Sequence, residues 1–246
     1  MKGIAIIGGT GLTSLPGLVV NEENIASTPF GDTSAALIKG LLKNRSIIFL
    51  ARHGSGHTIP PHKVNYRANI YALKEAGAEI IIAINAVGGI NPSLKPAQLL
   101  IPDQIIDYTY GREMSFFDGD DTPVVHIDFT EPYSEWLRQK LLDAADNCGI
   151  NLEKTGVYAA TQGPRLETAA EVRQLAQNGC DIVGMTGMPE ACLARELKCE
   201  YASISVIANL AAGLGEGEIT MNEIEKYIAQ GMGDVSRILE TVISQV

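Results

Sequence analysis

Short apolar runs recur along the chain, and most of them end in glycine or polar residues. Residues 4–7, 46–51 and 80–84 are the first such runs. Runs of this length with many β-branched residues are typical of buried strands. The run at residues 201–211 is similar but carries one amide, Asn209, near its end. Because open α/β sheets bind ligands beyond the carboxyl ends of their strands, this amide is a candidate ligand contact.

Two side chains remain open between a structural and a functional interpretation. Asn209 either bonds its own backbone, as asparagines at strand ends often do, or meets a ligand. Burying its amide unpaired would cost about 1 to 3 kcal/mol, so it requires a partner in either case. Glu167 is either an acid in the first turn of a helix, favoured by the helix dipole, or an acceptor directed at the ligand.

Amphipathic segments separate the strand-like runs. Residues 65–76 have apolar positions at helical spacing. Residues 131–149 predict a helix with Trp136 on its packed side, and Thr220 with Glu223 forms a capping box at the start of the last helix. We expect the inner face of that last helix to carry Met221, Ile224, Ile228, Val235, Leu239 and Val242. Further strands are predicted at 104–107, 156–160 and 181–187, and further helices after Thr168 and at 189–197.

This alternation predicts an α/β fold with a mixed, mainly parallel central sheet flanked by helices. At 246 residues and 46% hydrophobic, the chain is long enough for one core, and we expect a single domain over residues 1–246. Polar turns follow the strands, including 85–89, and a parallel sheet would bring these turns together at one edge. The edge would gather Thr10, Arg52, His53 and Asn85.

Composition excludes several classes of function. A net charge of -10 with only 19 Lys and Arg disfavours a nucleic-acid surface, because phosphate backbones are held by clustered cations. There is neither a secretory leader nor a run of 18 apolar residues, so we expect a cytoplasmic protein without membrane contact. Its 4 cysteines form no C-x-x-C pair and are expected to be reduced packing residues.

A glycine turn, Gly8-Gly9-Thr10-Gly11, follows the first strand. Such turns expose backbone N–H groups that can hold an anion. The turn is not a P-loop, because no Gly-Lys-Ser/Thr follows it. It also lacks the third glycine of a dinucleotide fingerprint, although Asp32 lies near the place of a ribose-binding acid and keeps that alternative open.

Arg52 and His53 follow the second buried strand. The planar arginine fork matches phosphate oxygens, and the histidine would add another donor. The alternative is an arginine that pairs with a surface carboxylate. His53, His57 and His62 do not predict a metal site, because Gly54 breaks any helix that would align them.

Short motifs in a fixed order carry a family resemblance. They are GGTG at 8–11, ARHG at 51–54, KVNY at 63–66, GPR at 163–165, MTGMPE at 185–190 and YASI at 201–204. Together they resemble the trimeric purine nucleoside phosphorylase and methylthioadenosine phosphorylase family over nearly the whole chain. The resemblance implies the nucleoside phosphorylase fold and a pentosyltransferase of purine salvage. In that reaction inorganic phosphate, as co-substrate, attacks the anomeric carbon of a purine nucleoside and releases the base.

The resemblance also implies roles for individual residues. An enzyme of this family would need no metal and no organic cofactor. Its partners would be a purine nucleoside, phosphate and further copies of the chain in a homotrimer or a hexamer. Asn209 and His53 are implied as catalytic, and the phosphate site as Thr10, Arg52, His53, Asn85, Ala86 and Thr186. The substrate site is implied as Met185, Leu166, Glu167, Asn209, Leu210 and Ala211, with leucine at 166 where the family often has phenylalanine.

Two departures within the family concern the purine. Its 6-aminopurine enzymes carry aspartates at the positions of Asn209 and Ala211, and serine at that of Glu167. Here Asn209 can donate to a 6-oxo group and still meet N7, while Glu167 can accept the N1–H of hypoxanthine. Both differences favour a 6-oxopurine, since the wrong base would leave buried groups unpaired.

The sugar end supplies a second clue. Family members for ordinary nucleosides tend to place a histidine near the 5'-hydroxyl, and this chain has none after His126. Met221 and Ile224, with His57, instead resemble an apolar wall for a 5'-methylthio group. The expected reaction is phosphorolysis of S-methyl-5'-thioinosine to hypoxanthine and 5-methylthioribose 1-phosphate.

Other functions remain open from the sequence. Within the enzyme class they are a methylthioadenosine phosphorylase and a broad inosine and guanosine phosphorylase. Outside it they are a non-catalytic purine-binding protein and a nicotinamide-dependent dehydrogenase built on the altered glycine turn.

Overall fold

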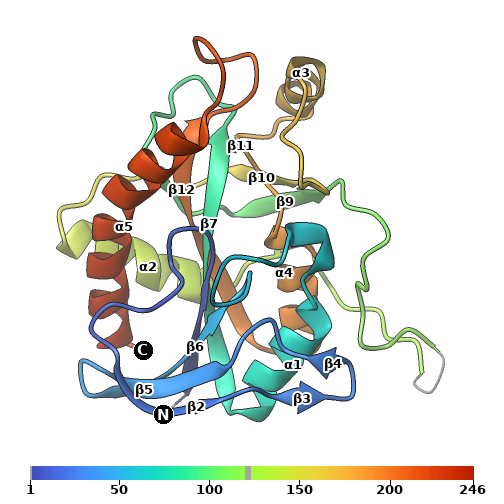
Figure 1. Cartoon of the computed structure of the whole chain (residues 1–246), viewed down its shortest axis with the longest axis vertical. Helices are drawn as coiled ribbons and strands as arrows, with labels where there is room; N and C mark the ends of the chain where they lie inside the picture. Colours follow the sequence, from blue (N-terminus) through green and yellow to red (C-terminus); the bar gives the residue numbers. More distant parts are fainter. Residues whose placement is uncertain (1, 120–122) are drawn as a thin grey trace.

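The computed structural model describes residues 2–119 and 123–246, and within them ten strands form one central sheet. The main path of the sheet runs β2-β5-β6-β1-β7-β11-β10-β9, while β12 pairs with β7 and with β8 (Figure 1). Strands β6, β1, β7 and β12 form one parallel group in that order, and β11, β10 and β9 form another. Antiparallel pairs join β2 to β5, β5 to β6, β11 to β7 and β8 to β12. The predicted mixed, mainly parallel sheet is confirmed.

The strands of this sheet have the following bounds: β1 Gly3–Gly8, β2 Val19–Asn24, β5 Leu37–Leu42, β6 Arg45–Ala51, β7 Ala78–Gly89, β8 Leu99–Leu100, β9 Gln104–Asp107, β10 Val157–Ala160, β11 Ile182–Gly184 and β12 Glu200–Leu210. A separate small hairpin joins β3 Ser27–Thr28 to β4 Gly31–Asp32. The helices are η1 Pro61–Lys63, α1 Tyr66–Glu75, α2 Glu135–Asn147, α3 Ala169–Gln177, α4 Gly187–Glu196 and α5 Met221–Ile243.

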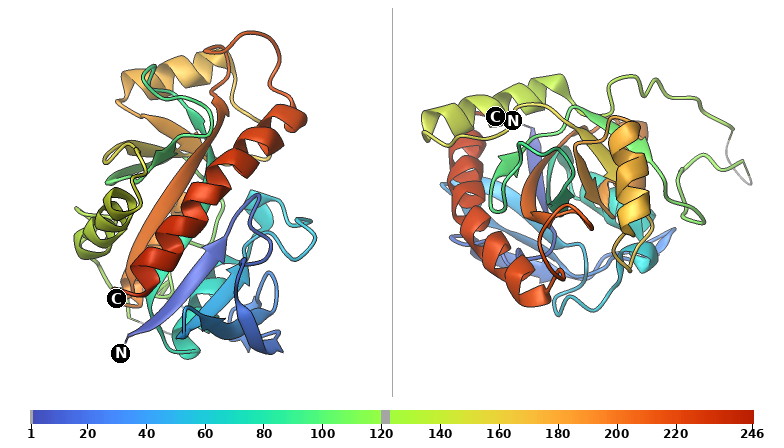
Figure 2. Two further views of the ribbon diagram at one scale, coloured as in Figure 1. Left: turned by 90° about the vertical axis from the view of Figure 1, so that its left-hand side faces the viewer. Right: turned by 90° about the horizontal axis from the view of Figure 1, so that it is seen from above.

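Helices cover both faces of the sheet. Helices α2 and α5 pack on one face and α1 and α4 on the other, as the two views of Figure 2 show together with Figure 1. Alternate residues of one strand therefore enter different cores: Ile4 and Ile6 face α2 and α5, whereas Ala5 and Ile7 face α1 and α4. Because both faces are buried there, residues 4–7 of β1 and 80–84 of β7 are apolar throughout instead of alternating with polar residues.

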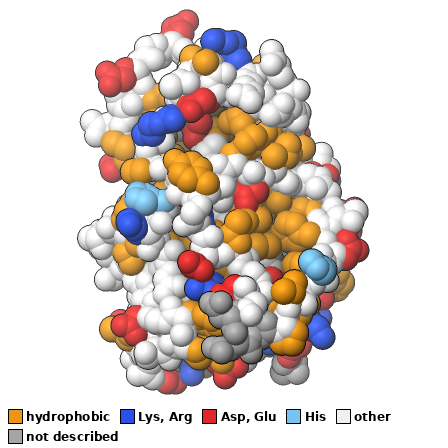
Figure 3. Space-filling model, turned by 90° about the vertical axis from the view of Figure 1, so that its right-hand side faces the viewer, with side chains coloured by type: hydrophobic (Ala, Val, Ile, Leu, Met, Phe, Trp, Pro, Cys, Tyr) orange, Lys and Arg blue, Asp and Glu red, His pale blue; other side chains and the backbone are white. Residues whose placement is uncertain are grey.

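One side of the molecule exposes many apolar side chains. Figure 3 shows them gathered on the face that carries α3 and the segment after β9. In that segment Tyr110, Met114, Val124 and Val125 are exposed.

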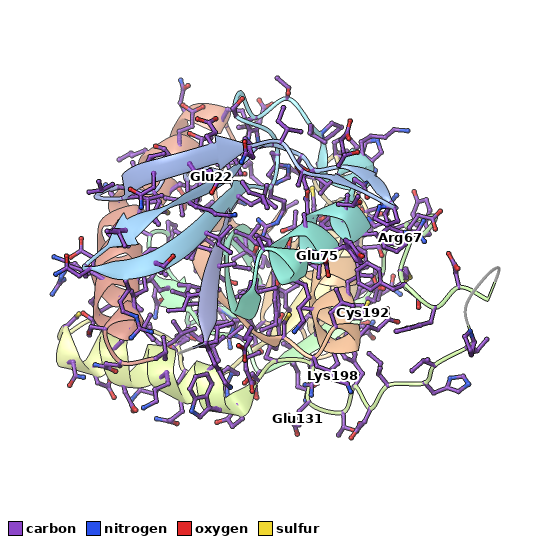
Figure 4. The ribbon with its side chains drawn as sticks, turned by 90° about the horizontal axis from the view of Figure 1, so that it is seen from below. Glu22, Arg67, Glu75, Glu131, Cys192 and Lys198 are labelled. Carbon is purple, nitrogen blue, oxygen red and sulfur yellow. The ribbon has the colours of Figure 1, made fainter. Side chains whose placement is uncertain are left out.

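Helices α1 and α4 lie side by side, and Glu75 and Cys192 mark them in the view from below (Figure 4). No helix in the described residues is both long and apolar enough to span a bilayer.

Capping side chains set the starts of three helices, α1, α3 and α5. The Asn65 side chain accepts from the backbone N–H of Ala68, and Thr168 forms a capping box with Glu171. Thr220 caps α5 by accepting from the N–H of Glu223, but the Glu223 carboxylate accepts from the Thr220 hydroxyl instead of completing the box.

The structure corrects the prediction in three places. Residues 85–89, expected as a turn, continue β7, because this part of the strand pairs with β12 and β11. Trp136 is not packed inside: it is 42% exposed, with the Lys2 ammonium over its ring. Met221 is likewise 61% exposed, because it stands at the first position of α5, beyond the part that packs on the sheet.

Candidate functional site

A cavity of about 550 Å³ lies at the carboxyl ends of β1, β6, β7 and β12. Because these strands are parallel, the residues that follow them meet at one edge of the sheet. The residues that we expected at the site and that line the cavity are Thr10, Arg52, His53, His57, Ala86, Leu166, Glu167, Met185, Thr186, Asn209, Ala211, Met221 and Ile224. Asn85 and Leu210, also expected there, are not among its lining residues.

Arg52 is fully buried and paired with a buried carboxylate, Glu190 of α4. Its Nε and Nη2 each donate to a carboxylate oxygen at 2.7 Å, and Nη1 donates to the Ile84 carbonyl oxygen at 3.0 Å. Burial acts to lower the pKa of the guanidinium, but the charge and hydrogen bonds of Glu190 outweigh it and hold the pKa above its ordinary value. The surface ion pair considered from the sequence is therefore replaced by a buried one.

Glu190 is a residue for which the sequence predicted no role beyond opening a helix. Its carboxylate also accepts from the Tyr201 hydroxyl at 2.8 Å. Burial and the neighbouring Glu190 charge raise the pKa of Tyr201 well above its usual value, so this hydroxyl stays a donor. The only sequence signal for Glu190 was its place in the MTGMPE motif.

The glycine turn after β1 lies against this pair. A Cβ on Gly9 would stand 2.8 Å from Nη1 of Arg52 and 2.4 Å from the Ile84 carbonyl oxygen. Only glycine lets the backbone approach the guanidinium this closely. Thr10 is thereby brought to the cavity wall beside Arg52.

His53 is neutral and has a defined tautomer. Its Nδ1 lies 2.8 Å from the carbonyl oxygen of Ile59, and because a carbonyl only accepts, Nδ1 carries the proton. Burial and the Arg52 charge lower the pKa of His53 to about 4. At neutral pH Nε2 is therefore an acceptor, not the additional donor that we expected from the sequence. The His57 ring packs against it with centroids 4.7 Å apart.

Thr186 and Asn85 form a second polar pair next to the cavity. The Thr186 hydroxyl donates to Asn85 Oδ1 at 3.3 Å. Asn85 is buried behind it, and its Nδ2 has no partner among the described residues. Thr186 thus presents the polar surface of this pair to the cavity, and Asn85 supports it.

Glu167 stands before the helix, not in its first turn. Thr168 is the N-cap of α3, and the acid of the first turn is Glu171. The Glu167 carboxylate lines the cavity and accepts from the Thr161 hydroxyl at 2.7 Å. Of the two interpretations left open by the sequence, the first-turn acid is therefore wrong.

Asn209 bonds its own backbone and also lies at the cavity, where a ligand contact stays a prediction. Its Nδ2 donates to the adjacent Leu210 carbonyl oxygen at 2.7 Å, and the residue also lines the cavity. An amide has two N–H donors and an acceptor oxygen, so this bond leaves one donor and the oxygen for other partners.

An irregularity in β12 places Asn209. The register between β12 and β7 shifts after Ile207: Ile207 pairs with Val87, and Asn209 pairs with Gly88. Ala208 is the extra residue, so both Ala208 and Asn209 line the cavity. Bulges of this kind redirect a side chain next to a functional site, and no feature of the apolar run predicted one.

An apolar wall closes another side of the cavity. Met221 and Ile224 of α5 line it together with Ile219 and Pro60. Ile224 is only 9% exposed and packs with Ala208, so it is fixed, whereas the Met221 side chain is mostly exposed.

Arg112 was missed by the sequence analysis, although it holds several cavity segments together. Its guanidinium donates to the carbonyl oxygens of Met185 at 2.8 Å, Met188 at 2.6 Å and Gln162 at 2.9 Å. It lies in a segment without regular structure, where the sequence suggested no chemistry. Backbone carbonyl partners leave no sequence signal, which explains the omission.

The described residues include no group of three or more His, Cys, Asp or Glu side chains able to hold a metal ion. Cys148, Cys180, Cys192 and Cys199 are free thiols.

Taken together, the sheet-edge cavity, its glycine turn and its polar side chains form a candidate small-molecule site. The chain belongs to the phosphorylase superfamily, whose family model matches residues 3–244. This confirms the resemblance seen in the short motifs.

Relatives with similar sequences support the same family. The chain is 53% identical over 240 residues to the probable S-methyl-5'-thioinosine phosphorylase of Pseudomonas syringae pv. tomato, with 98% of each chain covered. It is 44% identical over 248 residues to the 6-oxopurine nucleoside phosphorylase of Pyrococcus furiosus, covering 99% of this chain and 92% of that protein.

A solved structure agrees with the fold. The methylthioadenosine phosphorylase of Schistosoma mansoni in complex with adenine superposes with a TM-score of 0.96 at 32% sequence identity. The match covers 100% of this chain and 92% of that one.

Proposed function

We propose that the protein catalyses phosphorolysis of S-methyl-5'-thioinosine, giving hypoxanthine and 5-methylthioribose 1-phosphate. The observation that carries this proposal is the pairing of Glu167 and Asn209 in one cavity. A carboxylate accepts the N1–H that a 6-oxopurine has and a 6-aminopurine lacks, and an amide donates to O6 or N7. The names of the Pseudomonas and Pyrococcus relatives support the same base.

Phosphate, the co-substrate of this enzyme family, would bind at the Arg52 end of the cavity. Thr10 and the free N–H groups of Arg52 supply donors there, and Thr186, whose hydroxyl donates to Asn85 in this structure, lines the same cavity with Ala86. Nε2 of neutral His53 is placed to accept the P–OH proton of monohydrogen phosphate. The site would thus match an anion that carries two charges and a single proton.

In the mechanism that we propose, a phosphate oxygen attacks the anomeric carbon while the bond to the purine breaks. The sugar passes through a cation-like state between the phosphate anion and the departing base. Electrons of the broken bond move into the purine, where Asn209 can donate to the atom that becomes negative. Preorganised donors and exclusion of water account for such a rate without a covalent nucleophile, metal or organic cofactor.

The apolar wall would receive the 5'-methylthio group. Met221 and Ile224 offer carbon and sulfur surface, and burying a methyl-sized group is worth about 0.8 kcal/mol. This is enough for a preference over a 5'-hydroxyl but not for exclusion. The experiment therefore compares methylthioinosine with methylthioadenosine, which differs in the base, and with inosine, which differs in the sugar.

The test is phosphate-dependent base release from three nucleosides under the same conditions. We expect kcat/KM to be highest for methylthioinosine, lower for inosine and lowest for methylthioadenosine. Faster adenine release would contradict the assignment of the base. Equal rates with inosine and methylthioinosine would contradict the assignment of the sugar.

The same assay distinguishes a phosphorylase from the two alternatives outside this enzyme class. A non-catalytic purine-binding protein would be stabilised by hypoxanthine without turnover. A dehydrogenase would bind a nicotinamide dinucleotide and show no dependence on phosphate.

We further propose that one phosphorylase domain spans the chain and assembles as a cytoplasmic homotrimer, or as a hexamer of two trimers. The match of a single family model to residues 3–244 supports the one domain. The exposed apolar face with Tyr110 and Met114 supports self-association, because patches of this kind commonly mark interfaces (Figure 3). Sedimentation equilibrium gives the mass, and a monomer would contradict the assembly.

A further inference from the structure

The described residues provide one hydrogen bond to the Glu167 carboxylate. Its oxygen Oε1 accepts from the Thr161 hydroxyl, and Oε2 has no partner among the described residues. Thr161 follows directly after β10 and is fixed there, because its backbone N–H donates to the Gly184 carbonyl oxygen at 2.8 Å. The donor is therefore carried by the sheet, whereas Glu167 lies on a connecting segment.

Thr161 approaches Glu167 from outside the cavity. A second hollow of about 260 Å³ is lined by both Thr161 and Glu167, but Thr161 does not line the main cavity. The hydroxyl that holds Glu167 thus comes from a residue that lines the second hollow and not the main cavity. This arrangement leaves the other oxygen for a ligand in the cavity.

The Thr161 hydroxyl has one proton and two acceptors within reach. Glu167 Oε1 lies at 2.7 Å and the Gly184 carbonyl oxygen at 3.3 Å. Hydrogen bonds to a carboxylate are shorter and stronger than those to a neutral carbonyl, so the Thr161 hydroxyl donates its proton to Glu167 and not to Gly184. The hydroxyl thereby restrains the carboxylate without neutralising its charge.

The nearest cation in sequence is diverted from Glu167. Arg165 donates with both terminal nitrogens to Glu171, each at 2.8 Å. Hydrogen bonds from Arg165 and Thr168 lower the pKa of Glu171 to about 2, so Glu171 remains a charged partner for Arg165. Arg165 therefore forms its carboxylate hydrogen bonds with Glu171 and not with Glu167.

We propose that Thr161 is a positioning residue that directs Glu167 and so sets the preference for a purine with an N1–H. The inference rests on the proposed function, because it assigns Glu167 to the base. Without the hydroxyl, the carboxylate loses its restraint and turns toward solvent on either side. A 6-aminopurine would be affected little, since it offers no N1–H to this carboxylate.

The experiment compares Thr161→Val, which removes the hydroxyl but keeps the shape, with Thr161→Ser, which keeps the hydroxyl. We expect Thr161→Val to lower kcat/KM for methylthioinosine by about tenfold, the scale of one hydrogen bond. The value for methylthioadenosine and the KM for phosphate should stay within about twofold, on the same scale of free energy. Thr161→Ser should restore the ratio of the two nucleosides.

Thr241→Val is the matched control. The Thr241 hydroxyl also donates to a carbonyl oxygen, that of Arg237 on α5, at 2.9 Å. Its loss should leave the ratio of the two nucleosides unchanged. Equal losses for both nucleosides in Thr161→Val, or a serine variant that behaves like valine, would overturn the proposal.

Direct binding separates this inference from the proposed function. Calorimetry with hypoxanthine and adenine measures base preference without turnover. If the wild-type protein releases no hypoxanthine from methylthioinosine, the proposed function fails. The Thr161 inference then stands only if Thr161→Val reduces the ratio of hypoxanthine to adenine affinity, and an unchanged ratio overturns it.

Discussion

The two ends of the cavity hold their charged side chains in opposite ways. At one end Arg52 is fully buried, and Glu190 binds it through two hydrogen bonds and a full opposite charge. At the other end Glu167 is partly exposed and held by one neutral hydroxyl, that of Thr161. The first arrangement is part of the protein core, and the second is a restrained surface group.

This difference separates what the fold depends on from what selectivity depends on. A buried charge must be balanced by its partner, so changes at Arg52 or Glu190 should affect folding as well as phosphate binding. A partly exposed carboxylate has little effect on folding, so changes at Glu167 should affect binding and turnover of the nucleoside but not stability. The two ends can therefore be distinguished by measuring stability and kinetics on the same variants.

The largest effect is expected for Glu190→Ala. The variant leaves the Arg52 guanidinium buried without its counter-charge, and the Tyr201 hydroxyl without its acceptor. We expect the free energy of unfolding to fall by about 3 to 5 kcal/mol in urea denaturation. Glu190→Gln, which keeps shape and one acceptor, provides a folded variant in which the KM for phosphate should rise.

Asp146→Ala is the control for this prediction. Asp146 and Lys154 form an exposed pair at 3.0 Å, and such pairs contribute less than about 1 kcal/mol. Equal costs for the two variants would show that the buried pair is no more important to folding than a surface pair.

A smaller and different effect is expected for Glu167→Ala. Loss of a hydrogen bond to a charged group costs about 1.5 to 3 kcal/mol, so kcat/KM for methylthioinosine should fall about 10- to 150-fold. The KM for phosphate and the free energy of unfolding should change little. Steady-state kinetics with varied phosphate checks this, and a parallel loss of phosphate affinity would remove the distinction between the two ends.

The pH dependence of stability sharpens the comparison at the phosphate end. Burial and Arg52 lower the pKa of His53 from 6.5 to about 4, so between these values the unfolded chain binds a proton that the folded chain does not. The free energy of unfolding should therefore fall as the pH is lowered, by about 2 kcal/mol between pH 7 and pH 5 from His53 alone. Urea denaturation at both pH values measures this loss.

His53→Gln should lack this component of the pH dependence. His126→Gln, which changes an exposed histidine, should retain the wild-type dependence. An identical response of the three proteins would contradict the buried neutral state of His53.

The smallest effect is expected at the sugar wall. Met221 is mostly exposed, so Met221→Ala removes only part of the apolar contact for a methylthio group. We expect the ratio of kcat/KM for methylthioinosine to that for inosine to fall by less than roughly fivefold, which corresponds to about 1 kcal/mol. Leu41→Ala, another exposed apolar residue outside the cavity, should leave the ratio unchanged.

Much of the fold could be predicted because it depends on local patterns. The runs at residues 4–7 and 80–84 are buried on both faces, so every position is apolar and the strands are visible in the sequence. Asn65 and Thr168 cap helices through bonds to residues three positions away, and this spacing is also visible.

The rest depended on contacts between distant residues. Glu190 and Arg52 are 138 positions apart, and only the packing of α4 on the sheet brings them together. Arg112 binds backbone carbonyl groups, which every residue has, so no side-chain pattern identifies its partners. The exposure of Trp136 reflects where α2 meets the sheet, not the periodicity of α2 itself.

The extra residue in β12 has a consequence for transferring this site to another protein. If β12 paired regularly after Ile207, Ala208 would stand opposite Gly88 and Asn209 opposite Gly89, on the side of Ile207; because Ala208 is bulged, Asn209 stands opposite Gly88, which lines the cavity. The side of the sheet on which the amide lies therefore depends on the extra residue in the strand, not on which side chain stands at position 209. Grafting the asparagine into a regular strand would put the right group on the wrong side, whereas changing position 209 here preserves its direction.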